Sequence, residues 1–135
     1  PGQLVISGSI DAINTACEKM KEAGAKRALP LPVSGAFHSP LMQPAKDELQ
    51  AAIESVTFNA PRIPVYQNVD ALAHTDAEEI KKNLVAQLTG AVRWTATINN
   101  MIANGANDFT ECGPGKALQG MIGRIDKTVA AHGVE

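Results

Sequence analysis

The sequence predicts an α/β domain, and three observations support this fold class. A strand–helix–strand pattern occupies residues 3–32 at the start of the chain. A second strand pattern turns through two glycines into a helix over residues 108–125. The chain has 135 residues, of which 44% are apolar and 19% charged, and this is enough to build one globular domain with a hydrophobic core.

The strand–helix–strand pattern begins with the β-rich residues 3–7, and Ser9 follows as an N-cap. The predicted helix has one apolar face, formed by Ile10, Ile13, Cys17 and Met20. Gly24 is predicted to end this helix in the left-handed conformation, and residues 26–32 are predicted to form the next strand. A right-handed crossover would place both strands in one sheet.

A proline-bounded loop at residues 32–40 follows, and it contains one histidine, His38. No charged residue occurs between Arg27 and Lys46, so we expect this segment to lie against other protein. Ser39 and Pro40 suit the N-cap and first position of a helix. Because Pro44 interrupts the first turns, we predict a 3₁₀ turn there and a regular helix over residues 45–56.

The second half of the chain predicts two strands and three helices. Residues 65–69 read as a strand, and Thr75 and Glu78 have capping-box spacing for a helix that runs to Gly90. A further helix is predicted over residues 92–103, with Gly105 as its terminator. The inward residues of these two helices are predicted to be Ile80, Leu84, Leu88, Trp94, Ile98, Met101 and Ile102. The last strand, helix and intervening turn are predicted at 108–112, 118–125 and 113–116.

His38 is the first candidate for chemistry. A histidine in uncharged, conformationally restricted surroundings ahead of a helix can accept and return a proton near neutral pH. A packed structural histidine is the competing interpretation. No Gly-x-Ser-x-Gly nucleophile elbow is present in these residues, so a nucleophile for His38 is not evident in the chain.

Two weaker candidates lie elsewhere. Asn68 ends a predicted strand, where it either serves a site or satisfies turn backbone. The turn at residues 113–116 is predicted to leave free backbone N–H groups at a helix start, where an anion or oxyanion could bind, although tight packing explains such a turn equally.

Composition argues against several functions. The net charge of −2 and the few aromatic residues argue against a nucleic-acid surface. His38, His74 and His132 lack ligand-like spacing, so we expect no metal. Cys17 and Cys112 are predicted to be buried thiols without a disulfide framework, which suits a reducing cytosol. No apolar run is long enough to span a bilayer, and we expect no membrane association.

Five separated motifs together resemble a known family. They are PGQLVISG at 1–8, AGAKRALPLPVS at 23–34, FHSPLM at 37–42, QL at 87–88 with VRW at 92–94, and ECGPGK at 111–116. In sequence and order they are similar to the bacterial malonyl-CoA:acyl carrier protein transacylases. The resemblance corresponds to the carboxy-terminal part of such an enzyme. The family's serine nucleophile, oxyanion-hole glutamine and carboxylate-binding arginine belong to an amino-terminal part that is not present, and the opening on Pro1 without a Met agrees with this expectation.

The resemblance implies roles for two residues in catalysis. His38 matches the family's catalytic histidine, which activates the serine and later deprotonates the carrier-protein thiol. Gln87 matches a glutamine whose backbone carbonyl, rather than its side chain, orients that histidine in place of the Asp of a Ser-His-Asp triad.

Other roles implied by the resemblance concern binding and support. Gln3 falls in the substrate-side loop, and Lys26 and Arg27 match a basic pair that meets coenzyme A phosphates. Asn68 matches a position in the family's strand-end motif near the histidine, as a supporting residue. Phe37 resembles the form of the motif that selects malonyl over branched acyl groups. Cys112 is expected to be a core substitution, and residues 113–116 match the strand-to-helix turn that borders the site.

The family's architecture assigns residues 1–33 to the end of a ferredoxin-like small subdomain and residues 34–135 to the carboxy-terminal part of an α/β-hydrolase-like core. The implied function is transfer of malonyl from coenzyme A to the phosphopantetheine thiol of acyl carrier protein in fatty-acid biosynthesis, through a seryl ester. No cofactor is expected, because the coenzyme A thioester is a substrate. The expected partners are malonyl-CoA, the carrier protein and the missing amino-terminal portion, in the cytoplasm, and the fragment alone is expected to be inactive. The alternatives are an acyltransferase domain of a polyketide synthase and a non-catalytic ferredoxin-like α/β binding module.

Overall fold

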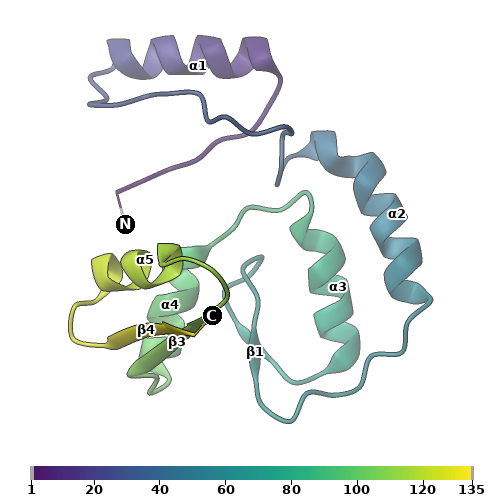
Figure 1. Ribbon diagram of the computed structural model, residues 1–135. Helices are drawn as coiled ribbons and strands as arrows, with labels where there is room; N and C mark the ends of the chain where they lie inside the picture. The colour runs from purple at the N-terminus through teal and green to yellow at the C-terminus, as the bar shows by residue number, and fades with distance from the viewer. Residues whose placement is uncertain (1, 135) are drawn as a thin grey trace.

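The computed structural model describes residues 2–134 and shows a mixed α/β arrangement, which confirms the predicted class (Figure 1). Helix α1 lies apart from the remaining elements, α2 and α3 lie side by side, and α4 and α5 lie beside a small parallel sheet (Figure 1). Pro1 lies outside the described residues.

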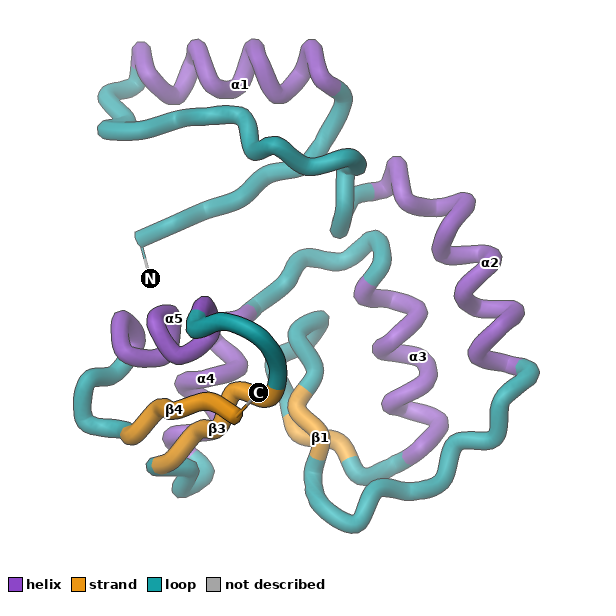
Figure 2. The backbone as a smooth tube through the Cα atoms, in the orientation of Figure 1, coloured by secondary structure: helices purple, strands orange, loops and turns teal. Residues whose placement is uncertain are grey.

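Helix α1 (Ile10–Glu22) forms as predicted, since the Ser9 hydroxyl accepts a hydrogen bond from Ala12 N and Gly24 has φ +88°. The strands predicted at residues 3–7 and 26–32 are wrong, because both segments are loops (Figure 2). A β-rich run becomes a strand only when a neighbour pairs with its N–H and C=O groups, and neither run has such a neighbour among the described residues. The β-rich composition of these two segments predicted strands, but within residues 2–134 the fold provides no neighbouring strand for either segment to pair with.

The loop around His38 leads into a 3₁₀ helix, η1 (Pro40–Met42), and then into α2 (Gln43–Glu54). The N-cap role of Ser39 is confirmed, since its hydroxyl accepts from Leu41 N at 3.3 Å. A 3₁₀ turn does precede the α-helix, but it lies at residues 40–42 and not at Pro44, which falls in the first turn of α2, so the helix begins and ends two residues earlier than predicted. Helix α2 packs against α3 (Ala77–Gln87), and each contributes a buried isoleucine, Ile53 and Ile80.

Between α2 and α3 lies an antiparallel hairpin of β1 (Val65–Tyr66) and β2 (Ala73–His74). The strand predicted at residues 65–69 is therefore shorter, because the chain turns at residues 67–72, which we call the hairpin turn. Asp70 Oδ1 accepts from Leu72 N at 3.0 Å inside this turn. An aspartate that bonds the backbone two residues on stabilises a turn over a continuing strand.

Helix α3 begins one residue later than the capping-box spacing predicts. The N-cap is Asp76, whose carboxylate accepts from Glu79 N at 2.8 Å, and not Thr75. The helix also ends at Gln87 rather than at Gly90, and residues 88–93 form a corner into α4 (Trp94–Ala103). We call residues 87–93 the α3–α4 corner. Helix α4 begins two residues after its predicted start and carries Ile98, the most deeply buried large side chain, at 1% exposure.

The carboxy-terminal elements form a parallel β–α–β unit. Strand β3 (Asp108–Cys112) has the predicted bounds, and α5 (Ala117–Ile125) connects it to β4 (Ala130–Val134). The sequence analysis missed β4, which pairs in parallel with β3 from Asp108↔Ala130 to Cys112↔Val134. Helix α5 packs against both strands and α4, so this unit has its own small core around Ile122.

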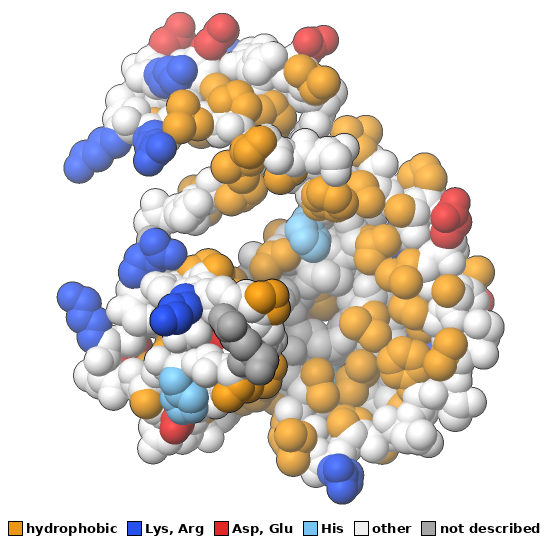
Figure 3. All heavy atoms as spheres, viewed as in Figure 1, with side chains coloured by type: hydrophobic (Ala, Val, Ile, Leu, Met, Phe, Trp, Pro, Cys, Tyr) orange, Lys and Arg blue, Asp and Glu red, His pale blue; other side chains and the backbone are white. Residues whose placement is uncertain are grey.

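Many apolar side chains lie on the surface of the described chain. Leu4 is 97% exposed. We call α1 together with its flanking loops, residues 2–33, the α1 region. Figure 3 shows apolar side chains over the α1 region and over the face of α2 and α3, with open space between the α1 region and the rest of the molecule. Among residues 2–134, six apolar residues are buried: Ala28, Ile53, Ala71, Ile80, Ile98 and Ile122. The core that positions the site is therefore the packing of α3, α4 and the hairpin turn rather than the α1 region.

Candidate active site

His38 adopts a conformation that non-glycine residues rarely use. Its φ is +61°, in the left-handed region, which costs an L-residue about 1–2 kcal/mol. The next residue restrains the loop, because the Ser39 hydroxyl donates to Ala36 O at 2.6 Å and accepts from Leu41 N. Ser39 is buried, whereas His38 is exposed. The loop thus holds the imidazole out from a fixed backbone.

The α3–α4 corner orients the His38 ring. Nδ1 of His38 lies 2.9 Å from the backbone carbonyl oxygen of Gln87, 49 residues away in the sequence. A carbonyl only accepts, so Nδ1 carries the proton and donates it, and the neutral ring has an unprotonated Nε2. Nε2 has no hydrogen-bond partner among residues 2–134. The exposed nitrogen is therefore the one able to accept a proton.

The Gln87 side chain stabilises the corner itself. Its amide Nε2 donates to Gly90 O at 2.9 Å and to Ala91 O at 3.3 Å, and the Gln87 carbonyl also accepts from Gly90 N at 3.3 Å. The carbonyl is available because it lies in the last turn of α3, where backbone acceptors lack helical partners. The backbone carbonyl of Gln87 accepts from His38, and the side-chain amide that closes the turn also lies near the ring, with its Nε2 3.5 Å from His38 Nδ1.

Asn68 supports this corner, and within residues 2–134 it forms no hydrogen bond with His38. Its backbone oxygen accepts from Arg93 N at 2.9 Å, and its Oδ1 accepts from the Thr97 hydroxyl at 3.4 Å. Both bonds tie the hairpin turn to the start of α4. The Asn68 side chain thus bonds a hydroxyl of α4 and not the backbone of its own turn.

The three predicted substrate-binding residues lie in the α1 region. Gln3, Lys26 and Arg27 are all exposed, and their side chains form no hydrogen bond or ion pair with another described residue. They are available to a ligand, but the structure does not bring them into contact with His38.

The glycine turn at residues 113–116 corrects one prediction. The N–H groups of Leu118 and Gln119 donate to the Glu111 carboxylate at 3.1 and 3.2 Å, so they are not free for an external anion. Partial burial opposes the charge, but these backbone hydrogen bonds outweigh it and lower the pKa of Glu111. The Glu111 carboxylate, which precedes the turn, is therefore the anion that the N-terminus of α5 binds.

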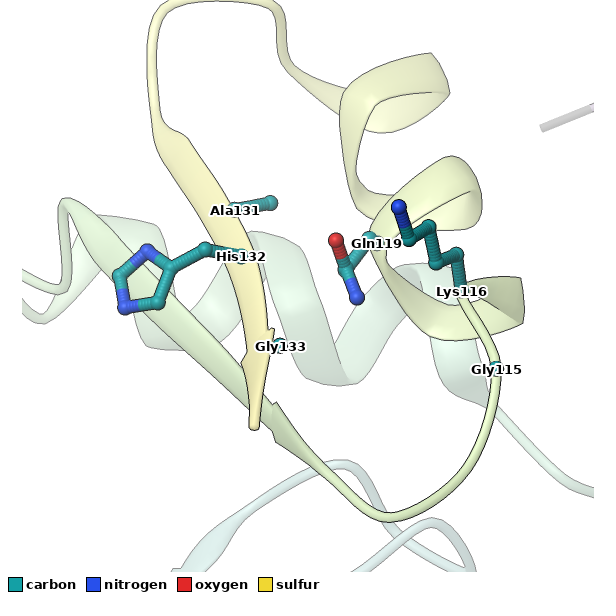
Figure 4. A pocket seen from close by; sticks show the side chains of 6 residues that line it. All are labelled: Gly115, Lys116, Gln119, Ala131, His132 and Gly133. Atoms are coloured by element: carbon teal, nitrogen blue, oxygen red, sulfur yellow. The ribbon is translucent and has the colours of Figure 1, made fainter. Parts of the chain in front are cut away.

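A shallow cavity of about 350 Å³ lies beside this turn, between the start of α5 and β4 (Figure 4). Lys116 and Gln119 extend over it from α5, whereas the His132 imidazole points away on the opposite side of β4 (Figure 4). None of its lining residues belongs to the His38 loop or to the α3–α4 corner. The cavity is therefore separate from the His38 site.

Both cysteines are free thiols, but Cys112 is exposed, so its prediction as a buried core residue is wrong. Successive residues of a strand face opposite sides, and β3 places Cys112 on its exposed side with Asp108 and Thr110. Within residues 2–134, no cluster of three or more His, Cys, Asp or Glu residues could hold a metal ion. No described helix has the length and hydropathy of a membrane span.

Comparison with known proteins identifies the family. The model of the acyl transferase domain family matches residues 1–131. The chain belongs to this family. It is 47% identical over 131 residues to the malonyl CoA-acyl carrier protein transacylase of Escherichia coli K12, and 43% identical over 138 residues to that of Bacillus subtilis 168. These matches confirm the resemblance that the five motifs indicated.

Solved structures of acyl transferase family members superpose on nearly the whole chain. The acyl carrier protein S-malonyltransferase of Vibrio cholerae is 49% identical, with a TM-score of 0.90 over 95% of this chain and 42% of that one. A malonyl-transacylase in complex with a type II polyketide acyl-carrier protein gives a TM-score of 0.88 at 42% identity, over 94% of this chain and 41% of that one. The match to the E. coli relative covers 97% of this chain but 42% of that protein. The match to the B. subtilis relative covers 100% of this chain but 44% of that protein. It therefore spans less than half the length of the curated relatives that it matches.

Sequence reasoning missed the contacts of three residues: Ser39 as a brace of the histidine loop, Glu111 as the cap of α5, and His74 between Asp70 and Glu79. The first two had local signals, a hydroxyl beside the histidine and an acidic residue before a glycine turn. His74 lies four residues after Asp70, but this spacing brings the imidazole and the carboxylate together only when the chain between them turns back.

Proposed function

We propose that the protein of which this chain forms part transfers malonyl from coenzyme A to the phosphopantetheine thiol of acyl carrier protein. The observation that carries the proposal is the contact between His38 Nδ1 and the Gln87 carbonyl, in a chain of the acyl transferase family. This contact leaves an exposed basic nitrogen oriented by a fixed acceptor, as acyl transfer through a serine requires.

The first half-reaction forms a seryl ester. Nε2 of His38 accepts the proton of a serine hydroxyl that lies outside these 135 residues, and the serine oxygen attacks the malonyl thioester carbonyl. The C–S bond then breaks, and the imidazolium returns the proton to the leaving coenzyme A thiolate. The Gln87 carbonyl stabilises the transient imidazolium, although a neutral acceptor does so less strongly than the carboxylate of a Ser-His-Asp triad.

The second half-reaction is the reverse with another thiol. His38 accepts the proton of the phosphopantetheine thiol, the thiolate attacks the seryl ester, and the proton returns to the serine oxygen as malonyl leaves. One base serves both halves because each begins and ends with neutral imidazole. The reaction needs no cofactor, since coenzyme A arrives as part of the substrate.

The α1 region supplies the proposed substrate contacts. The exposed side chains of Lys26 and Arg27 suit coenzyme A phosphates, and Gln3 suits a polar group of the same substrate. Phe37 is exposed beside His38, with its ring packed over Gly35, where it would leave little room for a branched acyl group. We also propose that residues 1–33 end a ferredoxin-like subdomain and that residues 34–135 belong to an α/β-hydrolase-like core. The separation of α1 from the other elements supports this division (Figure 1).

The proposed setting is fatty-acid synthesis in the cytoplasm, without nucleic acid or membrane partners. A second candidate function, malonyl loading of a polyketide carrier protein, is favoured by the likeness to the malonyl-transacylase in complex with such a carrier. Parallel assays with a fatty-acid and a polyketide carrier protein would separate the two functions by their kcat/KM values.

The decisive experiment uses a chimera in which this chain replaces the matched segment of the E. coli relative. We expect the chimera to transfer malonyl and His38→Ala to lower kcat by at least about 100-fold, the range of general acid–base catalysis. His132→Ala, a change of another exposed histidine, is the matched control and should retain activity. A folded His38→Ala chimera with unchanged kcat would refute the proposal.

The isolated 135-residue chain gives an independent test. Because the proposed serine lies outside it, the chain alone should neither transfer malonyl nor gain its mass by mass spectrometry. Malonyl transfer by the isolated chain would contradict the proposed division of the site. This measurement does not depend on whether the chimera folds.

A further inference from the structure

A polar cluster lies at the base of the hairpin turn, outside the His38 site. His74 ends β2 and is only 8% exposed. Its Nε2 lies 2.8 Å from Asp70 Oδ2 in the hairpin turn, and its Nδ1 lies 3.1 Å from Glu79 Oε2 in α3. The imidazole is thus held between two carboxylates from two different elements.

These contacts specify the charge of the ring. Ionised carboxylates only accept hydrogen bonds, so a ring that bonds one through each nitrogen must carry both protons. Burial opposes the charged ring, but the hydrogen bonds and charges of Glu79 and Asp70 outweigh it and raise the pKa of His74. Burial likewise opposes ionisation of Asp70, but bonds from Leu72 N, His74 and Asn83 lower its pKa. Below its raised pKa, the His74 ring is therefore an imidazolium with two carboxylate partners.

A second hydrogen-bond arrangement lies within reach of the same ring. Asn83 Nδ2 is 3.0 Å from Asp70 Oδ2, 3.1 Å from Gln67 Oε1 and 3.1 Å from His74 Nε2. In the imidazolium state the amide donates to Asp70 and Gln67. When Nε2 loses its proton, its lone pair can accept from Asn83 instead, and Asp70 loses its bond to the ring. Deprotonation thus exchanges partners across the contact between the hairpin turn and α3.

The hairpin turn also supports the α3–α4 corner. Asn68 O accepts from Arg93 N at 2.9 Å, and a Cβ placed on Gly90 would lie 3.1 Å from Val69 Cγ2. On the α4 side the turn is bonded by neutral groups, since Asn100 Nδ2 donates to Ala71 O at 2.8 Å. Movement of the hairpin turn relative to α3 would therefore displace the α3–α4 corner, which carries the Gln87 carbonyl.

We propose that His74 is a positioning residue, whose imidazolium locks the hairpin turn to α3 and whose deprotonation loosens the α3–α4 corner that orients His38. The lock is a property of the fold, and its effect on catalysis rests on the proposed function of His38. A metal site is the wrong description, because the two carboxylates face opposite ring nitrogens and do not converge on one point.

The test is an NMR titration of the 135-residue chain. We expect the His74 ring to titrate with a midpoint above 6.5, and the amide signals of Gly90 and Arg93 to shift with the same midpoint. Asp70→Asn should lower the midpoint of His74. Asp108→Asn, which neutralises the carboxylate 3.3 Å from the exposed ring of His132, is the matched control and should leave it unchanged.

Two results would overturn the inference. One is a His74 midpoint at or below 6.5, and the other is corner amide shifts that persist with the same midpoint in His74→Gln. If His74→Gln does not fold, Glu79→Gln provides the second variant, which should lower the midpoint while keeping the ring. An unchanged His74 midpoint in Glu79→Gln would likewise overturn the inference of a lock.

Catalysis adds a separate readout. In an active chimera, His74→Gln should remove the part of the pH dependence of kcat/KM whose midpoint equals that of His74, whereas His132→Gln should keep it. An identical pH profile in His74→Gln would overturn the coupling to His38. A chimera that folds but transfers no malonyl would refute the proposed function, and the NMR titration would still decide whether the lock exists.

Discussion

Replacement of Gln87 by alanine separates the backbone role of this residue from a side-chain role. The carbonyl that accepts from His38 Nδ1 belongs to the backbone and remains in Gln87→Ala. The change removes the amide bonds to Gly90 O at 2.9 Å and to Ala91 O at 3.3 Å, together with a long 3.5 Å contact between the amide Nε2 and His38 Nδ1. The first has good geometry and the second is long, so the loss amounts to about one net hydrogen bond, or about 1 kcal/mol.

This loss sets the expected size of both measured effects. The free energy of unfolding of the 135-residue chain should fall by about 1 kcal/mol, which lowers Tm by about 3–5 °C for a domain of this size. If the whole loss appeared in the transition state, kcat/KM of the chimera would fall by less than about tenfold. His38→Ala, in contrast, should cost at least about 100-fold.

The assay compares malonyl transfer rates and thermal unfolding for Gln87→Ala, His38→Ala and Gln50→Ala. Gln50 is a suitable control because its amide bonds only Glu54 on the exposed side of α2, at 2.8 Å. A folded Gln87→Ala protein whose rate falls as far as that of His38→Ala would refute the backbone role. Equal, small effects at Gln87 and Gln50 on both measurements would show that the corner does not depend on the amide.

Three further predictions concern stability. Ile98→Ala should lower the free energy of unfolding by about 2–5 kcal/mol in urea, because the side chain is fully buried, whereas Leu4→Ala at 97% exposure should change it by less than about 0.5 kcal/mol. Asp76→Ala should lower it by about 0.5–2 kcal/mol through loss of the α3 cap, with Thr75→Ala near neutral, and the reverse order would show that the capping box is real. Because the pKa of His74 is raised in the folded state, the contribution of His74 to the free energy of unfolding is complete below pH 6.5 and is lost as pH rises through the folded-state pKa. Urea unfolding between pH 5.5 and about 8.5 should show this decline in stability, and His74→Gln should flatten it.

Local signals predicted the elements whose stabilising contacts are close in sequence. The Ser9 cap, the left-handed Gly24 and the Ser39 cap before Pro40 involve groups within a few residues of one another. The bounds of β3 followed from alternation over five residues and the glycines after it. The two strands predicted beside α1 failed because a strand needs a distant partner. For the same reason β4 was missed, since Ala130–Val134 becomes a strand through its pairing with β3.

The candidate site shows the same division. His38 could be singled out from the uncharged, proline-rich loop around it, and the family motifs pointed to Gln87. The charge state of His74 could not be read from the sequence, because Asp70, Glu79 and Asn83 meet the ring only after the hairpin turns back onto α3.

By itself, the sequence determined the α/β class, most helix positions, the acyl transferase family, the proposed base His38 and Gln87, the residue whose carbonyl orients it. Propensities, caps and motifs depend on residues that are close in sequence, and they can therefore be predicted from the sequence. Only the tertiary structure decided that Glu111 caps the start of α5 and that His74 lies between two carboxylates, and it supplied the 2.9 Å contact between His38 and the Gln87 carbonyl that the family motifs implied. Each of these depends on distances between groups that become neighbours only when the chain folds.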